Sequence, residues 1–472
     1  MDFFQRIFTI FVLIPYFFLG CANSSRHAEA EHVGRVITNA DFPEDLTSEC
    51  REFIKSLPTD FGFNFIQVPE NWDQHKDSLN LRIFYYYYKP NETVAPSTIF
   101  FNGGPGFSGH NLLSAWKVLL PKYKIPMIFI DQRGTGCSSP YPQIVSDTET
   151  DRFSHYGSRA IVRDAEAIRK TLLGENSKWQ IFGQSYGGLI VHRYLTLYPE
   201  NIKSVYSHGF AISNSPLGPY YEKMLGQNRI AEQYFASHSE VRNRLILIRQ
   251  KIKSSQCFSK NTFKICGDGI LDGILAAYFN ANLIKDLEVT STKLILPTGD
   301  LDLAFLNELA SKHVISVYAS ADTNSGNEQE IAAQNARKYI GKMEMDSGIS
   351  HSSDPAHCKA IFRKLVLKGQ RPNDWILNPC RFIISIQKAK ISAQVKADPL
   401  DLLNVKKFIS QNPSISFYLY SGSLDSFEPS ELFQDESKKI PRIRYTNFSN
   451  SGHEGFVTEP QVWKDLLASK TH

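Results

Sequence analysis

The residue of this chain with the clearest chemical potential is a serine flanked by glycines. Ser185 lies in the run GQSYGG at 183–188, which has the spacing G-x-S-x-G. The apolar segment 179–182 before it is typical of a buried strand, and 189–198 after it is typical of a helix. A serine at such a turn is exposed at the helix N-terminus, where backbone N–H groups favour negative charge. The run therefore predicts a nucleophilic serine that attacks a carbonyl carbon.

A nucleophilic serine needs a base, and the C-terminal part of the chain offers one. Asp425 follows the predicted strand 415–420, and His453 follows the predicted strand 443–448. Both lie on loops past strand carboxyl ends, where α/β sheets place their sites, in the chain order serine, acid, histidine. We therefore predict that Ser185, Asp425 and His453 form a catalytic triad, with His453 as base and Asp425 as the group that orients it. The nearest rivals for the acid are Asp435 and Glu428, and the final segment has no other histidine except the terminal His472.

A glycine-rich loop after the first core strand is the candidate oxyanion hole. Residues 102–106 read NGGPG, and glycines let the backbone approach a substrate closely. Pro105 has no N–H to donate, so we predict that the backbone N–H groups of Gly104 and Tyr186 stabilise the oxyanion. A plain Gly-Pro turn is the alternative.

The elements around these residues alternate between strand and helix. Continuous apolar strands separated by helices indicate a mostly parallel sheet covered on both faces. Residues 60–88 are expected to form paired strands at its beginning. The further strands are predicted at 98–101, 127–130, 179–182, 203–208, 415–420 and 443–448, and the helices at 112–120, 159–173, 189–198 and 461–468.

The alternation stops in the middle of the chain, which predicts an insertion. Residues 215–405 carry helical patches, such as 270–279 and 303–309, and four of the seven cysteines. We expect a helical cap or lid here. The core then has a first part, 46–214, and a second part, 406–472.

Three motifs in this order resemble the proline iminopeptidase and tripeptidyl aminopeptidase family of serine peptidases. They are NGGPG at 102–106, DQRGTGCS at 131–138 and the Ser185 run, and the helix at 163–169 resembles the family helix before the nucleophile strand. The family's first motif begins with histidine, where this chain has Asn102. The resemblance implies an α/β-hydrolase fold and removal of residues or short peptides from free N-termini through an acyl-enzyme, without metal or organic cofactor.

Two other function classes stay open. An esterase or other acyl hydrolase uses the same triad, and a non-catalytic surface-binding protein can keep the same scaffold. An acid of the cap facing the acyl pocket would favour the peptidase, and an apolar cap pocket would favour the esterase. The expected partner is a peptide or a small acyl substrate. The net charge is +4 and the basic residues are scattered, which favours neither nucleic acid nor a strongly acidic partner. Oligomeric state, peptide length and side-chain preference are left open.

The N-terminus resembles an export signal. The apolar stretch 7–20 is short for a membrane-spanning helix, which needs about 20 residues, so we expect a signal peptide at 1–21. A glycine before Cys21 resembles a bacterial lipoprotein processing site, where the cysteine is lipidated, and 22–45 would be a polar linker. The expected location is the bacterial cell envelope, on the membrane surface. An ordinary secretory signal is the alternative.

The remaining cysteines number six, an even count that suits an oxidising compartment. We expect the disulfides Cys257–Cys266 and Cys358–Cys380 from their proximity in the insertion, and Cys50–Cys137 by elimination. Buried free thiols are the alternative.

Overall fold

The computed structural model describes most of the core and part of the insertion. The described residues are 42–74, 78–90, 97–144, 147–211, 219–260, 263–280, 283–315, 328–344, 355–367, 369, 371, 375–378, 386–387, 398, 400–425, 428–440 and 442–468. The predicted signal, Cys21, Cys380 and His472 lie outside them.

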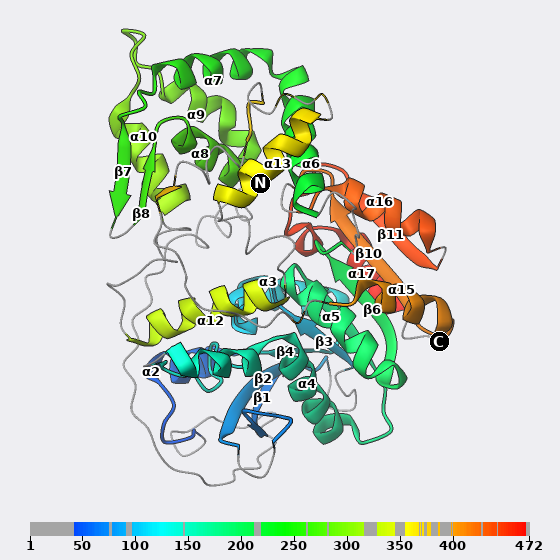
Figure 1. Cartoon of the computed structure of the whole chain (residues 1–472). Helices are drawn as coiled ribbons and strands as arrows, with labels where there is room; N and C mark the ends of the chain where they lie inside the picture. Colours follow the sequence, from blue (N-terminus) through cyan, green and yellow to red (C-terminus); the bar gives the residue numbers. More distant parts are fainter. Residues whose placement is uncertain are drawn as a thin grey trace.

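The central element is an eight-stranded sheet in the order β1-β2-β4-β3-β5-β6-β10-β11 (Figure 1). Its strands are β1 (Phe61–Pro69), β2 (Asn80–Tyr88), β3 (Thr98–Phe101), β4 (Met127–Ile130), β5 (Trp179–Gln184), β6 (Ile202–His208), β10 (Ser416–Gly422) and β11 (Ile443–Phe448). β2 pairs antiparallel with both neighbours, and all pairs from β4 to β11 are parallel. The mostly parallel sheet predicted from the sequence is confirmed.

Helices cover both faces of the sheet, because its central strands are apolar on both sides. One apolar layer includes α4 (Ser158–Leu173), α5 (Tyr186–Leu197), α15 (Leu402–Gln411) and α16 (Ser430–Lys439). The opposite layer includes α2 (Ser48–Lys55), α3 (Leu113–Tyr123) and α17 (Pro460–Ala468). All six strands predicted after residue 97 are present, each within a few residues of its expected bounds.

The insertion follows β6 and builds a core of its own. Figure 1 shows its helices as a second body beside the sheet. Its apolar cluster draws on α6 (Pro219–Ser237), α7 (Ser239–Lys251), α8 (Gly269–Asn280), α9 (Leu287–Lys293), α10 (Leu303–Leu309) and α13 (Pro355–Leu367). The sequence did not predict the small antiparallel sheet of β7 (Cys257–Lys260), β8 (Phe263–Cys266) and β9 (Ile386–Gln387) within it.

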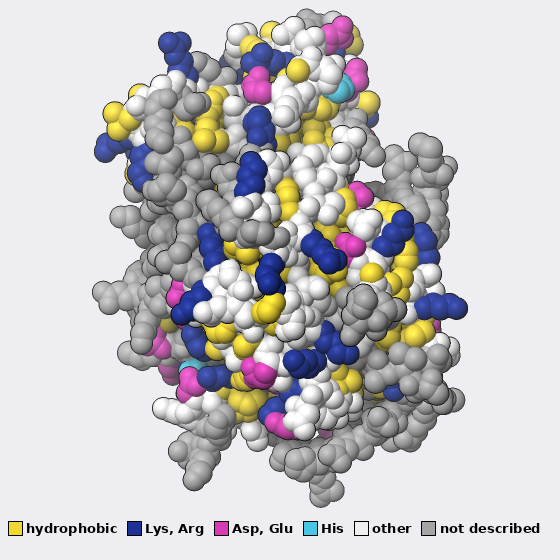
Figure 2. Space-filling model, turned by 90° about the vertical axis from the view of Figure 1, so that its right-hand side faces the viewer, with side chains coloured by type: hydrophobic (Ala, Val, Ile, Leu, Met, Phe, Trp, Pro, Cys, Tyr) yellow, Lys and Arg dark blue, Asp and Glu magenta, His cyan; other side chains and the backbone are white. Residues whose placement is uncertain are grey.

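One helix of the insertion packs on the sheet rather than on that second core. The apolar side chains of α12 (Glu328–Glu344) join the layer formed by α4 and α5. Among the described residues, the helices are either too short or too polar to cross a lipid bilayer. On the face in Figure 2, the Lys and Arg side chains that are drawn in colour are spread singly over the surface.

Two predicted disulfides are confirmed. Cys50–Cys137 joins α2 to the loop after β4, with 5.5 Å between Cα atoms, and Cys257–Cys266 joins β7 to β8. The third predicted bridge, Cys358–Cys380, involves a residue outside the described ones.

The Cys50–Cys137 bridge is expected to stabilise the core, because it closes a loop of 87 residues in the unfolded chain. The Cys50→Ala/Cys137→Ala double variant should lose about 4 kcal/mol of unfolding free energy, measured by urea denaturation without reductant. The matched control is Cys257→Ala/Cys266→Ala, whose loop spans 9 residues and should contribute about 2 to 3 kcal/mol. Equal unfolding free energies for wild type and the first variant would contradict the expectation.

Candidate active site

Ser185 lies at the tight turn between β5 and α5. Its backbone has φ 56° and ψ −121°, a conformation that side-chain-bearing residues rarely adopt. The backbone N–H of Ser185 donates to the carbonyl of His208 at the end of β6 (2.8 Å), and its own carbonyl accepts from Gly188 (2.7 Å). These bonds hold the serine at the carboxyl edge of the sheet, before the first turn of α5.

The flanking glycines are required by close backbone approach. A Cβ atom on Gly187 would lie 2.0 Å from the carbonyl oxygen of Phe101 in β3, and one on Gly183 would lie 2.0 Å from that of Gly187. Any side chain at either position would therefore push α5 away from the strands. This close backbone approach explains why glycine occupies both flanking positions of the G-x-S-x-G motif in this chain.

Asp425 and His453 meet at the same edge of the sheet. Asp425 follows β10 and is fully buried, and its Oδ2 lies 2.8 Å from Nδ1 of His453, which follows β11. The other carboxylate oxygen of Asp425 accepts the backbone N–H of Glu428 (2.9 Å). The carboxylate of Asp425 therefore fixes the orientation of the His453 imidazole. Glu428, another candidate for the triad acid, helps to fix that carboxylate through its backbone N–H.

The surroundings of the two histidines in this region shift their pKa values in opposite directions. Burial opposes protonation of His453, but the charge of Asp425 and its hydrogen bond outweigh burial and raise the pKa of His453 above its ordinary value of 6.5. Burial lowers the pKa of His208 to about 3. His208 is therefore a neutral ring near pH 7, and His453 is the more basic of the two imidazoles.

The loops that carry these residues are neighbours. The side-chain amide of Gln184 donates to the carbonyl of His453 (3.1 Å). A Cβ on Gly209, which follows β6, would lie 3.0 Å from Cε1 of His453. The loops after β5, β6 and β11 thus converge on one point, although their residues are far apart in the sequence.

The glycine loop after β3 lies beside the serine. A Cβ on Gly103 would lie 3.1 Å from Cβ of Ser185. Asn102 holds this loop with both ends of its amide, since Nδ2 donates to the carbonyl of Ser108 and Oδ1 accepts from the N–H of Gly103, each at 2.8 Å. Gln132 donates to the carbonyl of Asn102 (2.9 Å). Asn102 is thus a loop-holding residue at the position where the family motif has histidine.

The second glycine motif is structural in this chain. Arg133 is buried and makes two hydrogen bonds to Asp164 of α4, and it also donates to the carbonyls of Glu70 and His155. Burial raises the pKa of Asp164 despite this guanidinium. The pair therefore ties the loop after β4 to α4, the helix that precedes the nucleophile strand.

One cluster has metal-ligand chemistry. Ligand-type atoms of His110, Asp131 and Cys137 lie within 4.8 Å of one another. However, the sulfur of Cys137 is bonded to Cys50, and Asp131 already accepts backbone N–H groups of Gly109 and Cys137, each at 2.8 Å. The donor set therefore fits a loop anchor better than a metal centre.

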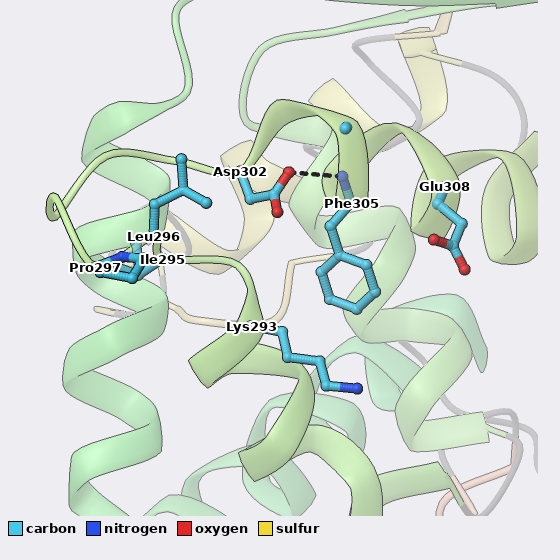
Figure 3. A pocket seen from close by; sticks show the side chains of 8 residues that line it. Lys293, Ile295, Leu296, Pro297, Asp302, Phe305 and Glu308 are labelled. Atoms are coloured by element: carbon cyan, nitrogen blue, oxygen red, sulfur yellow. Dashed lines mark hydrogen bonds between the residues drawn. The ribbon is translucent and has the colours of Figure 1, made fainter.

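A pocket of about 600 Å³ lies in the insertion, between the end of α9 and α10 (Figure 3). In Figure 3, Asp302 caps α10 by accepting the backbone N–H of Phe305 (2.9 Å), and Lys293 and Glu308 are the other charged side chains that line the pocket. None of the predicted site residues lines this pocket.

The positions of the remaining site residues follow from the fold. Gly104 lies in the loop beside Ser185, and Tyr186 is the first residue of α5. His208 and Glu344, whose side chains contact this region, carry no sequence motif and were missed. The side chain of Asp435, which the sequence offered as another candidate for the triad acid, is not among the side chains that the structure describes.

Comparison with known proteins supports this architecture. Residues 96–232 match a family model described as alpha/beta hydrolase fold. The chain is 31% identical over 166 residues to a proline iminopeptidase of Aeromonas sobria, which covers 32% of this chain and 38% of that protein. It is 28% identical over 123 residues to a proline iminopeptidase of Chitinophaga pinensis, with 26% and 38% covered.

The chain thus matches little more than a third of the length of these relatives. Among solved structures, an alpha/beta hydrolase enzyme from a deep-sea metagenome library aligns with 83% of this chain and 95% of that chain, at 12% identity and a TM-score of 0.39. By its sheet and by the family model, this chain is an α/β-hydrolase-fold protein, and its matched segment confirms the resemblance to the proline iminopeptidases.

Proposed function

We propose that this protein is a serine peptidase that releases residues or short peptides from free N-termini, with Ser185, Asp425 and His453 as its triad. The observation that carries the proposal is the Asp425–His453 pair (2.8 Å) on loops that converge with the strained turn of Ser185. The similarity to proline iminopeptidases supports the same reaction class.

In the proposed reaction, His453 accepts the Ser185 proton while the serine oxygen attacks the substrate carbonyl. The backbone N–H groups of Gly104 and Tyr186 stabilise the oxyanion of the tetrahedral intermediate. The imidazolium donates its proton to the leaving amine, and an acyl-enzyme forms. Water, activated by the same imidazole, then hydrolyses the ester and restores the serine.

The charges around His453 favour a cationic substrate over a neutral ester. Glu428 and Glu454 act on His453 in the same direction as Asp425, since each raises its pKa. Glu454 is exposed and follows His453 directly. A protonated α-amine would be attracted to this carboxylate-rich edge. Both glutamates lie outside the predicted cap, so the cap acid that would separate peptidase from esterase stays a prediction.

The Ser185→Ala variant is expected to lower turnover by about 10⁶-fold while the fold is retained, because it removes the nucleophile alone. A fluorophosphonate probe should label wild type at Ser185 and should not label the variant. Labelling of the variant at another serine would refute the assignment, and an unlabelled wild type would favour a non-catalytic binding protein.

A substrate panel separates peptidase from esterase. Peptide amides with free N-termini should be hydrolysed, and the same peptides with acetylated N-termini should not, with short-chain nitrophenyl esters as the reference. Hydrolysis of esters without hydrolysis of any free peptide amide would replace the peptidase by the esterase alternative.

The pH dependence should follow the charge state of His453. Since His453 must be neutral to act as the base, kcat/KM should be low at acidic pH. It should rise as the pH increases through the pKa of His453, which lies above 6.5. Asp425→Asn removes the carboxylate that raises this pKa, so the acid limb should move to lower pH while kcat falls by about 10⁴-fold. Glu454→Gln is the comparison: it should move the limb less than Asp425→Asn, and its effect on activity should appear in KM because Glu454 lies at the edge proposed to attract the substrate amine. An unmoved acid limb in Asp425→Asn would argue against the assigned pair.

We also propose that the protein is exported and held at a membrane surface by a lipid on Cys21. The two disulfides of the described residues are compatible with an oxidising compartment. One acylated cysteine followed by a polar linker at 22–45 would leave the catalytic body soluble.

Cys21→Ser should release the protein into the soluble fraction and leave catalysis unchanged, because the substitution removes the acylation site alone. Detergent partition and mass spectrometry of the N-terminal peptide provide the measurement. A mature chain that begins after Cys21, or an unmodified Cys21, would indicate an ordinary secretory signal.

A further inference from the structure

Helix α12 connects the insertion to the nucleophile turn. It lies on the sheet body rather than beside the other helices of the insertion (Figure 1). Its buried face contributes Ala332, Ala336, Tyr339, Ile340 and Met343 to the apolar layer of α4 and α5. The helix therefore has a fixed position relative to the strand-to-helix turn that carries Ser185.

The last residue of α12 places a buried carboxylate between two core helices. Glu344 is 3% exposed. Its Oε2 accepts the hydroxyl of Tyr186 (2.6 Å), and its Oε1 accepts both the backbone N–H (2.7 Å) and the hydroxyl (2.8 Å) of Ser158. Tyr186 begins α5 and Ser158 begins α4. One side chain of the insertion thus binds the first residues of both helices.

A glycine and an arginine next to Glu344 accommodate its carboxylate. The residue before α4 is Gly157, which has no side chain to cap the helix, and a Cβ there would lie 2.5 Å from Oε1 of Glu344. Glu344 therefore accepts one of the N-terminal backbone N–H groups of α4, which have no partner within the helix. Arg193 donates to the hydroxyl of Ser158 (3.2 Å), which places a cation beside the buried anion.

Burial raises the pKa of Glu344, and its hydrogen bonds and Arg193 oppose that rise. Breaking this network would leave two hydroxyls and one N–H buried without their acceptor, which is costly in a protein interior. The arrangement is therefore more than a surface contact between the insertion and the core.

We propose that Glu344 is a positioning residue for the proposed hydrolase reaction, which holds Tyr186 and thereby aims its backbone N–H at the oxyanion. The proposal rests on the function inferred above. The ring of Tyr186 is buried and is held at its hydroxyl by Glu344, while its backbone follows Ser185 directly. A ring fixed at its far end restricts how the first turn of α5 can shift, and small shifts of an oxyanion donor are costly.

The test uses the rate of Ser185 phosphonylation by a fluorophosphonate, which needs the nucleophile and the oxyanion donors but no particular peptide. Glu344→Gln and Tyr186→Phe should each lower this rate, and kcat, by about 10- to 100-fold with little change in KM. The double variant should be no slower than the slower single variant, because both changes act on the same hydrogen bond: Tyr186→Phe removes its donor, and Glu344→Gln replaces its charged acceptor by a neutral amide.

The matched control is Tyr339→Phe on the same helix. Its hydroxyl donates to Asp151 (2.9 Å), away from the nucleophile turn. This variant should lose thermal stability and keep the phosphonylation rate. An equal loss of rate in Tyr339→Phe would show that Glu344 only anchors α12, and would overturn the proposal.

Two further outcomes are distinguishable. If wild type is labelled at Ser185 and Glu344→Gln is labelled equally fast, the positioning role is refuted while the hydrolase proposal stands. If wild type is not labelled, the hydrolase proposal fails and the positioning role fails with it. Because Glu344→Ala can unfold the protein, Glu344→Gln and Tyr186→Phe carry the test, and circular dichroism checks that both are folded.

Discussion

The close approach of β3, β5 and α5 around Ser185 is the constraint on which the rest of the structure depends. A side-chain-bearing residue with positive φ costs about 1 to 3 kcal/mol and persists only where its surroundings fix it. Here the carbonyl of His208 and the packing of Gly183 and Gly187 against backbone atoms fix it. The parallel pairing of β3 with β5 and of β5 with β6 supplies that rigidity.

Buried polar groups then connect this turn to more distant elements. Arg133 and Asp164 join the loop after β4 to α4, and Glu344 joins α4 and α5 to the insertion. Each of these groups is satisfied by hydrogen bonds, as burial of charge requires. Two separate groups of buried hydrogen bonds therefore join the helices around the site to more distant segments, and the apolar layers on the two faces of the sheet pack around them.

The sequence predicted the sheet and its helices well, because the strands are short apolar runs bounded by glycines and polar turns. For example, the strands predicted within 60–88 are present as β1 and β2, and β11 has the predicted bounds 443–448. Ser185 was predicted as the nucleophile because the strand-to-helix turn needs glycines, and these leave a recognisable spacing in the sequence. Asp425 and His453 were predicted from chain order and strand ends, and the structure brings these two side chains together.

What the sequence could not predict depends on contacts between distant segments. Glu344 is one glutamate in a helix of ordinary composition, and only the folded chain brings it to Ser158 and Tyr186. The packing of α12 on the sheet could not be predicted for the same reason, because it also depends on contacts with segments far away in the sequence. The short strands β7 and β8 were hidden because a hairpin of four-residue strands leaves too little alternation to recognise.

The position of the insertion also determines the order in which the site is completed. Ser416 of β10 pairs with Ser204 of β6, so the whole insertion lies between two adjacent strands. During synthesis, the segment with Ser185 emerges before the insertion, and Asp425 and His453 emerge after it. Such distant pairing makes the last strands slow to join. With the proposed triad, the growing chain would carry Ser185 without its base until β10 and β11 dock, and it would be inert until folding is complete.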